Sequence, residues 1–299
     1  MNPQGRFNMR KVLLATTALV ALGGVSAASA DVSVSGNGSI TYKNDGSTTQ
    51  LGQDGNVTIK GTSTSDAGVT YSVVYNQSFM RSNGDSPDIE DAYIQADGDF
   101  GTFFAGATDS ALDRVDGVLG QNFDYEGYSA GGTRTYIGTE IGIGENDAAI
   151  NYMSPKMNGV QIQGVFQETS TTSTTGMGVS YSNDLFSVIY QTSSGDTDKT
   201  TVGASFSAAG ITVGMGAQTD DNNGSKTKSS DVGIKYSMGE LGLYATSQRG
   251  KLGSAEDEYN SMGATYSIAP GVTAALETVN GDDSGTGYSG TFASVNVKF

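Results

Sequence analysis

From Asp31 to Phe299 the sequence repeats one pattern, in which apolar and polar residues alternate over runs of about ten residues. The run Val69–Asn76 shows the pattern clearly, because every second residue is apolar: Val69, Tyr71, Val73 and Tyr75. Successive side chains of a β-strand point to opposite faces, so strict alternation predicts strands with one apolar and one polar face. No stretch after residue 30 has the length and apolar character of a transmembrane helix.

About sixteen such runs are predicted, and their connections alternate between longer and shorter ones. The longer connections are polar, and among them we expect loops at Lys43–Asp54, Thr219–Lys228, Arg249–Asp257 and Asn280–Gly287. Tilted strands of ~9–11 residues cross a bilayer, with short turns on one side and longer loops on the other. A soluble sandwich gives no reason for its connections to be sorted in this way.

A barrel of about sixteen strands is too wide for side chains to fill its interior. We therefore expect the polar faces to line a water-filled lumen and the apolar faces to meet lipid, with every backbone group paired in a closed ladder. The predicted fold is all-β: a transmembrane antiparallel up-and-down β-barrel formed by residues 31–299.

The first thirty residues predict export. Arg6, Arg10 and Lys11 form a basic region, and the apolar run Val12–Val25 is too short to span a bilayer as a helix. Ala28-Ser29-Ala30 has the small residues of a cleavage site, so residues 1–30 are predicted to be a cleaved secretory signal peptide. Met9 is a plausible alternative start of translation.

Composition excludes several classes of function. Removing residues 1–30 removes three basic and no acidic residues, which leaves 13 Lys and Arg against 32 Asp and Glu, a net charge of −19. Such a charge argues against nucleic acid or an anionic membrane surface as a partner. Without His or Cys the chain cannot carry a Ser-His-Asp or Cys-His catalytic group, or a zinc site with those ligands. The expectation is that the protein is not an enzyme and holds no cofactor.

The longest connection, residues 108–145, is acidic. Structureless loops longer than roughly 15 residues are uncommon unless they are functional or disordered. Apolar and aromatic residues such as Val118, Phe123 and Tyr136 argue against disorder, so we expect a folded insert. Its acidic candidates for a pore constriction are Asp109, Asp113, Asp116, Asp124, Glu126 and Glu140.

At this point the chain resembles the trimeric general porins of Gram-negative bacteria, of the alphaproteobacterial kind. The resemblance is carried by Ala92-Tyr93-Ile94, Phe100-Gly101, Gly106 and the Tyr152, Ser154, Pro155 and Gly159 positions, with Phe299 as a terminal aromatic that resembles the assembly signal of such barrels. It implies a homotrimer in the outer membrane, in which the third extracellular loop folds into the lumen and sets pore size and charge.

The resemblance further implies a basic side of the pore opposite the acidic loop. The candidates are Lys43, Lys60, Arg81, Arg114, Arg134 and Lys235, a sparser set than the family's usual arginine cluster. Charged groups at a constriction tune ion selectivity. The expected function is passive diffusion of small hydrophilic solutes and ions, with a mild preference for cations.

Some alternatives remain open at this stage. The runs Asp220–Gly224 and Asp282-Asp283 offer oxygen ligands, so calcium bound at these loops is possible in principle, although their spacing does not match an EF-hand. A secreted β-rich adhesin or surface-layer protein would share the acidic, cysteine-free composition. A solute-specific channel would share the barrel and show saturable flux.

Overall fold

The computed structural model describes residues 31–44, 46–80, 88–115, 148–222, 224–252, 255–283 and 285–299. Sixteen strands form within these residues. Their bounds are β1 Asp31–Asn44, β2 Thr49–Thr64, β3 Thr70–Met80, β4 Ile89–Gly98, β5 Gly101–Ala107, β6 Ala149–Met153, β7 Val160–Glu168, β8 Ser173–Ser182, β9 Phe186–Ser194, β10 Asp198–Ala208, β11 Ile211–Asn222, β12 Ser225–Met238, β13 Leu241–Leu252, β14 Ala255–Ala269, β15 Val272–Asp283 and β16 Thr286–Lys298.

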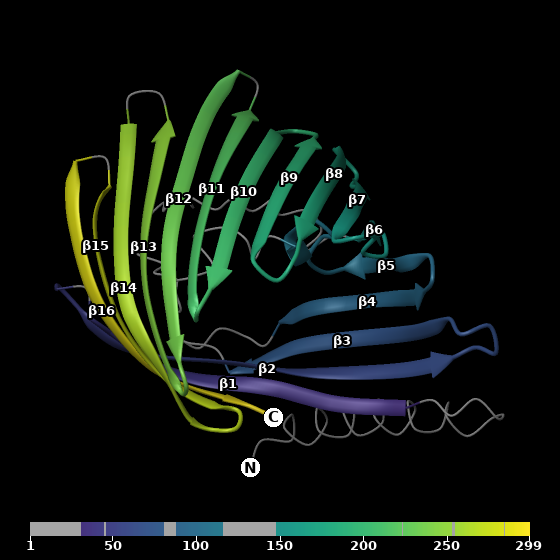
Figure 1. Cartoon of the computed structure of the whole chain (residues 1–299), viewed down its shortest axis with the longest axis horizontal. Helices are drawn as coiled ribbons and strands as arrows, with labels where there is room; N and C mark the ends of the chain where they lie inside the picture. Colours follow the sequence, from purple (N-terminus) through teal and green to yellow (C-terminus); the bar gives the residue numbers. More distant parts are fainter. Residues whose placement is uncertain are drawn as a thin grey trace, which may run out of the picture.

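Each strand pairs with its neighbours in sequence, and β1 also pairs with β16, so the sheet closes into a barrel (Figure 1). All pairings are antiparallel. The prediction of an up-and-down antiparallel barrel of about sixteen strands is confirmed. Closure leaves no sheet edge, which is the condition for placing strands in lipid.

The two faces of the barrel wall differ in composition, as alternation predicts. Large apolar side chains stand on the outer face and are exposed, for example Val34 at 60%, Ile94 at 61% and Met177 at 64%. Their strand neighbours on the opposite parity face the lumen and are mostly polar, such as Gln163 and Gln191. The apolar outer face is the lipid-facing surface of the barrel.

The described residues contain no helix with the length and apolar character needed to span a membrane. The predicted signal peptide, residues 1–30, lies outside the described residues, and its cleavage stays a prediction.

Four of the predicted polar loops are largely strand. The ladder continues to Asn44 and resumes at Thr49, and the β11–β12 connection is reduced to residues 223–224. The β13–β14 and β15–β16 connections are equally short, so the prediction of loops at Arg249–Asp257 and Asn280–Gly287 was wrong. Strands that extend beyond the apolar band meet water on both faces, so hydrophobic alternation ends while backbone pairing continues.

The seam between β16 and β1 reaches Phe299. Its backbone N–H donates to the carbonyl oxygen of Gly36 at 3.0 Å, and the N–H of Gly36 donates back at 3.0 Å. The Phe299 ring lies against Gly36, where a Cβ would stand 2.8 Å from the ring. Whether Phe299 acts as an assembly signal stays a prediction.

Candidate functional site

The chain leaves β5 and forms a compact turn on the lumen side of the wall, which we call the anchor segment (Thr108–Val115). Ser110 and Asp113 cap each other in it. The Ser110 N–H and hydroxyl both donate to Asp113 Oδ2, at 2.9 and 2.7 Å, and the Leu112 N–H donates to Ser110 Oγ at 3.2 Å. These bonds satisfy donors at the start of the 3₁₀ turn Asp113–Val115, as N-terminal caps do.

Two amide side chains of the lumen wall hold the anchor segment by its backbone. Asn151 on β6 accepts a hydrogen bond from the Ala111 N–H at 2.8 Å. Gln191 on β9 donates from Nε2 to the Leu112 carbonyl oxygen at 2.6 Å. Both amides are almost completely buried, so these bonds are shielded from competition with water. The wall therefore fixes the path of the chain on entry into the lumen.

Leu112 is the apolar part of this attachment. Its side chain is fully buried and packs with Ala149 of β6 and Val165 of β7. Gly178 on β8 makes room for it, because a Cβ at that position would lie 3.0 Å from Leu112 Cδ2. An apolar contact of this kind on a mainly polar lumen wall gives the anchor segment a defined position.

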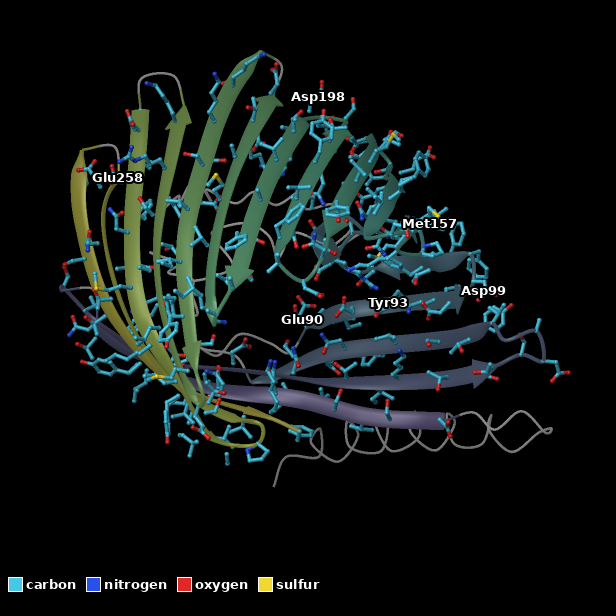
Figure 2. The ribbon with its side chains drawn as sticks, viewed as in Figure 1. Glu90, Tyr93, Asp99, Met157, Asp198 and Glu258 are labelled. Carbon is cyan, nitrogen blue, oxygen red and sulfur yellow. The ribbon has the colours of Figure 1, made fainter. Side chains whose placement is uncertain are left out.

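Arg114 extends from the anchor segment over an aromatic platform on the neighbouring strands. Its guanidinium carbon lies 3.7 Å from the centre of the Phe104 ring on β5 and 5.2 Å from that of Tyr93 on β4, which Figure 2 labels. Its Nη1 donates to Gln95 Oε1 at 3.4 Å. Stacking on aromatic faces holds a guanidinium without neutralising its charge. Arg114 thus places one cation in a mainly acidic part of the lumen.

Asp109 lies beside Arg114 and is exposed in the lumen. Partial desolvation by the surrounding wall raises the pKa of its carboxyl above the ordinary value of 3.8, and the negative charge of Asp91 on β4 raises it further. Arg114 opposes these two effects. Asp109 is therefore protonated on acidification before an ordinary aspartate is.

The raised pKa of Asp109 predicts how the ion selectivity of the channel depends on pH. A raised pKa means that the negative charge of Asp109 is lost at a pH above 3.8 as the solution is acidified. Cation preference, measured as the reversal potential in a KCl gradient, is expected to fall between about pH 7 and pH 4. In Asp109→Asn the fall should be smaller and begin at lower pH. Identical pH profiles for the two proteins would contradict this assignment.

The structure locates some of the predicted constriction residues. Asp109 and Asp113 belong to the anchor segment, where the Asp109 side chain is exposed and one oxygen of Asp113 is used in the cap. The remaining predicted acidic residues lie outside the described residues: Asp116, Asp124, Glu126 and Glu140.

The predicted basic residues divide into two groups. Lys60 on β2 faces the lumen opposite Val74, and Val74 is opposite Tyr93, so Lys60 stands two strands from the Arg114 platform, about 10 Å away across the sheet. Lys43 on β1 and Lys235 on β12 face the lumen on a different row of the ladder. Arg81 and Arg134 lie outside the described residues.

The row of the ladder that holds Lys43 and Lys235 also contains a hydrogen-bonded pair, Tyr244 and Glu277, that the sequence analysis did not predict. Counting across the ladder from Lys43, the row passes Phe292, Glu277, Gly263 and Tyr244 before it reaches Lys235. Tyr244 lies across Gly263 and donates from its hydroxyl to Glu277 Oε2 at 2.6 Å. The sequence feature that could have predicted this pair is a lumen-facing Tyr, Gly and Glu at matching positions of the consecutive strands β13, β14 and β15.

The described lumen wall carries more carboxylates than cations. The wall carboxylates are Asp31, Asp54, Asp91, Asp97, Asp220, Asp231, Asp257 and Glu277, and the wall cations are Lys43, Lys60, Lys199, Lys235 and Lys298. With Asp109 and Asp113 against Arg114, the anchor segment adds to the same imbalance. The electrostatic potential of the lumen is expected to favour cations.

The absence of a cofactor stays a prediction, with calcium at the loops Asp220–Gly224 and Asp282-Asp283 as its alternative. In the described ranges there is no group of three or more acidic residues placed to hold a metal ion. In the β11–β12 turn, Asp221 accepts a hydrogen bond from the Gly224 N–H at 2.8 Å and pairs with Lys226 at 3.2 Å.

A closed barrel with an apolar outer face, a polar lumen and a segment anchored inside that lumen defines a pore-forming protein of the outer membrane. Sequence comparison makes the assignment specific, because a profile described as "Gram-negative porin" matches residues 15–286. The chain belongs to this family and is an outer-membrane porin. No curated protein matches it in a direct sequence search.

Solved structures agree with the fold at low sequence identity. OmpT of Vibrio cholerae, with its loop L8 deleted, is 12% identical and superposes with a TM-score of 0.77 over 90% of this chain and 99% of that one. OmpT in its trimer form gives 0.74 at 12% identity, over 90% of this chain and 99% of that one. A variant of the Rh. blastica porin gives 0.70 at 18% identity, over 90% of this chain and all of that one.

Proposed function

We propose that this porin is a general diffusion channel with a mild preference for cations. The observation that carries the proposal is the excess of carboxylates over lysines on the described lumen wall, which continues into the anchor segment. Passage then depends on the size and charge of the lumen, and no chemical step or cofactor takes part.

We propose further that the acidic connection, residues 108–145, narrows the pore. The support comes from its described beginning, where Leu112, Asn151 and Gln191 fix the chain against the inner wall. The acidic residues that follow the anchor segment would then face Lys60 and Arg114 across the constriction. Opposed charges of this kind create a transverse field that orients polar solutes.

We also propose a homotrimer with residues 1–30 removed. The trimer form recorded for V. cholerae OmpT supports the oligomer, and the basic, apolar and small-residue order of the N-terminus supports cleavage. Conductance steps that arrive in threes would report the trimer directly.

The test is the reversal potential of single channels in planar bilayers under a KCl gradient. The wild-type channel is expected to favour potassium, and Asp91→Asn with Asp109→Asn is expected to reduce that preference because both carboxylates lie in the lumen. Asp221→Asn with Glu258→Gln removes the same charge from the outer surface and serves as the matched control. A wild-type preference for chloride would refute the proposal.

A further inference from the structure

The cations on the outer surface of the barrel are concentrated in one place. In the described strands, every lysine or arginine on the outward parity belongs to β12 or β13: Lys226, Lys228, Arg249 and Lys251. All lie towards the loop ends of these strands, the end at which Figure 2 labels Glu258 on the adjacent β14. We call these residues the basic ridge. Their concentration contrasts with the acidic character of the whole chain.

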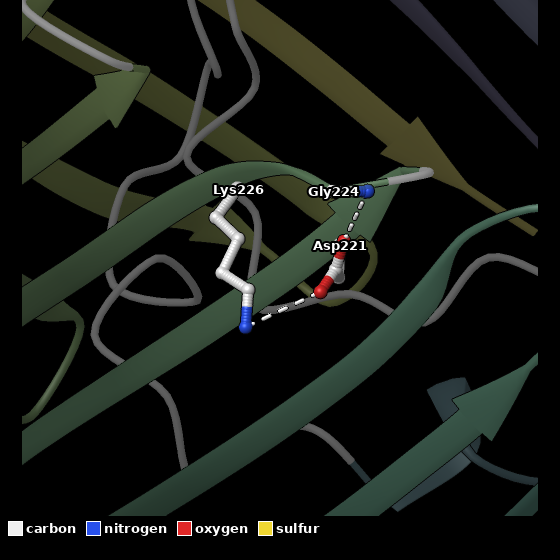
Figure 3. Close-up of polar contacts among 3 residues, drawn as sticks. All are labelled: Asp221, Gly224 and Lys226. Atoms are coloured by element: carbon white, nitrogen blue, oxygen red, sulfur yellow. Dashed lines mark hydrogen bonds and ion pairs between the residues drawn. The ribbon is translucent and has the colours of Figure 1, made fainter.

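Two of these cations are already paired. Lys226 Nζ lies 3.2 Å from Asp221 Oδ2, and Asp221 is held by the Gly224 N–H (Figure 3). Arg249 Nε lies 3.3 Å from Glu258 Oε2. Both pairs are exposed, with cation side chains 60% and 61% accessible, so each contributes little to stability. Neither ion pair includes Lys228 or Lys251, which occupy the middle of the basic ridge.

Lys228 and Lys251 stand directly opposite each other across the β12–β13 ladder. Like charges in this register destabilise a sheet unless an anion lies between them. Glu256 is opposite Lys251 on β14, yet neither lysine forms an ion pair within 4.0 Å in the described part of the chain. The two ammonium groups are therefore available to an external anion.

The position of Lys228 and Lys251 along their strands decides whether their side chains reach the lipid headgroups. Along β12 the outward residues pass from Ile234 and Val232, both nearly half exposed, through Ser230 to Lys228. Four residues cover about 13 Å of strand, which a tilt of about 45° reduces to about 9 Å in height. Lipid headgroups occupy a layer of about 5–8 Å beyond the hydrocarbon core. Flexible lysine side chains that stand just above an apolar surface reach into this layer.

We propose that Lys228 and Lys251 form a binding site for the headgroup of an anionic phospholipid, whose phosphate would lie between the two ammonium groups, with Lys226 and Arg249 at the margins of the site. The apolar surface directly below, which includes Val232 and Ala245, would contact the acyl chains of the same lipid. Two adjacent ammonium groups complement a phosphate in charge, and the acidic remainder of the barrel wall would disfavour anionic lipids elsewhere.

The experiment counts lipids retained by the purified protein in native mass spectrometry, with the whole chain expressed and isolated from membranes. Phosphatidylglycerol and phosphatidylcholine are added as competing probes. Lys228→Gln with Lys251→Gln should lower retention of phosphatidylglycerol on the order of tenfold and leave phosphatidylcholine unchanged, because each basic residue near an anionic surface adds several-fold affinity. Single-channel conductance should stay as in wild type, since both residues face outward.

The matched control is Lys60→Gln with Lys235→Gln, which removes the same charge from the lumen and should leave lipid retention unchanged. Equal retention by the ridge variant and this control would overturn the proposal. Two other results would also overturn it. If inorganic phosphate displaces phosphatidylglycerol at equal concentration, the site takes free phosphate. If the ridge variant changes the oligomeric state, the ridge is a contact between subunits.

Discussion

Leu112→Asp is expected to give a channel whose open current is larger and noisier than that of wild type, while the barrel itself still folds. Leu112 is fully buried against Ala149 and Val165, and truncating a buried leucine costs about 2–5 kcal/mol. A carboxylate at this place adds the cost of burying an unpaired charge, so the anchor segment is expected to leave the wall. The sixteen-strand ladder does not depend on this contact, because the closing backbone bonds lie between strands.

The measurement is single-channel recording at fixed voltage, together with urea unfolding of the barrel in lipid vesicles. Leu185→Asp is the matched control, since it makes the same chemical change at an exposed turn between β8 and β9. The unfolding midpoints of both variants should stay close to wild type. If Leu112→Asp conducts as quietly as Leu185→Asp does, the anchor segment does not control the pore.

The barrel is predictable from sequence because one physical rule acts on every strand. A residue such as Val73 meets lipid and its neighbour Ser72 faces the lumen, so the alternation of apolar and polar residues persists wherever the wall crosses the apolar layer. Beyond the apolar layer the alternation of apolar and polar residues ends. Lys226 and Arg249 are strand residues by backbone pairing, but water on both sides removes the hydrophobic contrast that identifies a strand.

The anchor segment is harder to predict for a different reason. Gln191 meets Leu112 across 79 positions of sequence, and nothing distinguishes it locally from other polar residues that face the lumen. Asn151 is equally ordinary in its strand. The length and acidity of residues 108–145 predicted a folded insert that begins at Thr108, where the anchor segment begins, whereas the wall residues that hold this segment follow only from the register of β6 and β9 in the closed barrel.

Gly263→Val is expected to destabilise the barrel by about 2.5–6 kcal/mol, the largest effect we predict for a single added side chain. Gly263 separates Tyr244 from Glu277 in the ladder, and the Tyr244 ring occupies the space above it. A Cβ there would overlap the Tyr244 hydroxyl and lie 2.7 Å from the Leu276 carbonyl oxygen, which is backbone and cannot move away. Overpacking contributes about 1–3 kcal/mol, and loss of a hydrogen bond to a carboxylate about 1.5–3 kcal/mol.

Two further variants separate these contributions in urea unfolding of the vesicle-inserted barrel. Tyr244→Phe keeps the ring over Gly263 and removes only the 2.6 Å hydrogen bond to Glu277, so it should show the hydrogen-bond part of the loss, about 1.5–3 kcal/mol. Gly164→Val adds the same side chain on the outer face of β7, where nothing lies within 4 Å of a Cβ, and its midpoint should match wild type. If Gly263→Val unfolds at the same urea concentration as Gly164→Val, the Tyr244 ring can move off Gly263 at no cost. The packing of Tyr244 on Gly263 would then add nothing to the stability of the barrel. A large loss in Gly263→Val with a small one in Tyr244→Phe would instead assign the effect to packing, because the ring and not its hydroxyl would then hold β13 against β14.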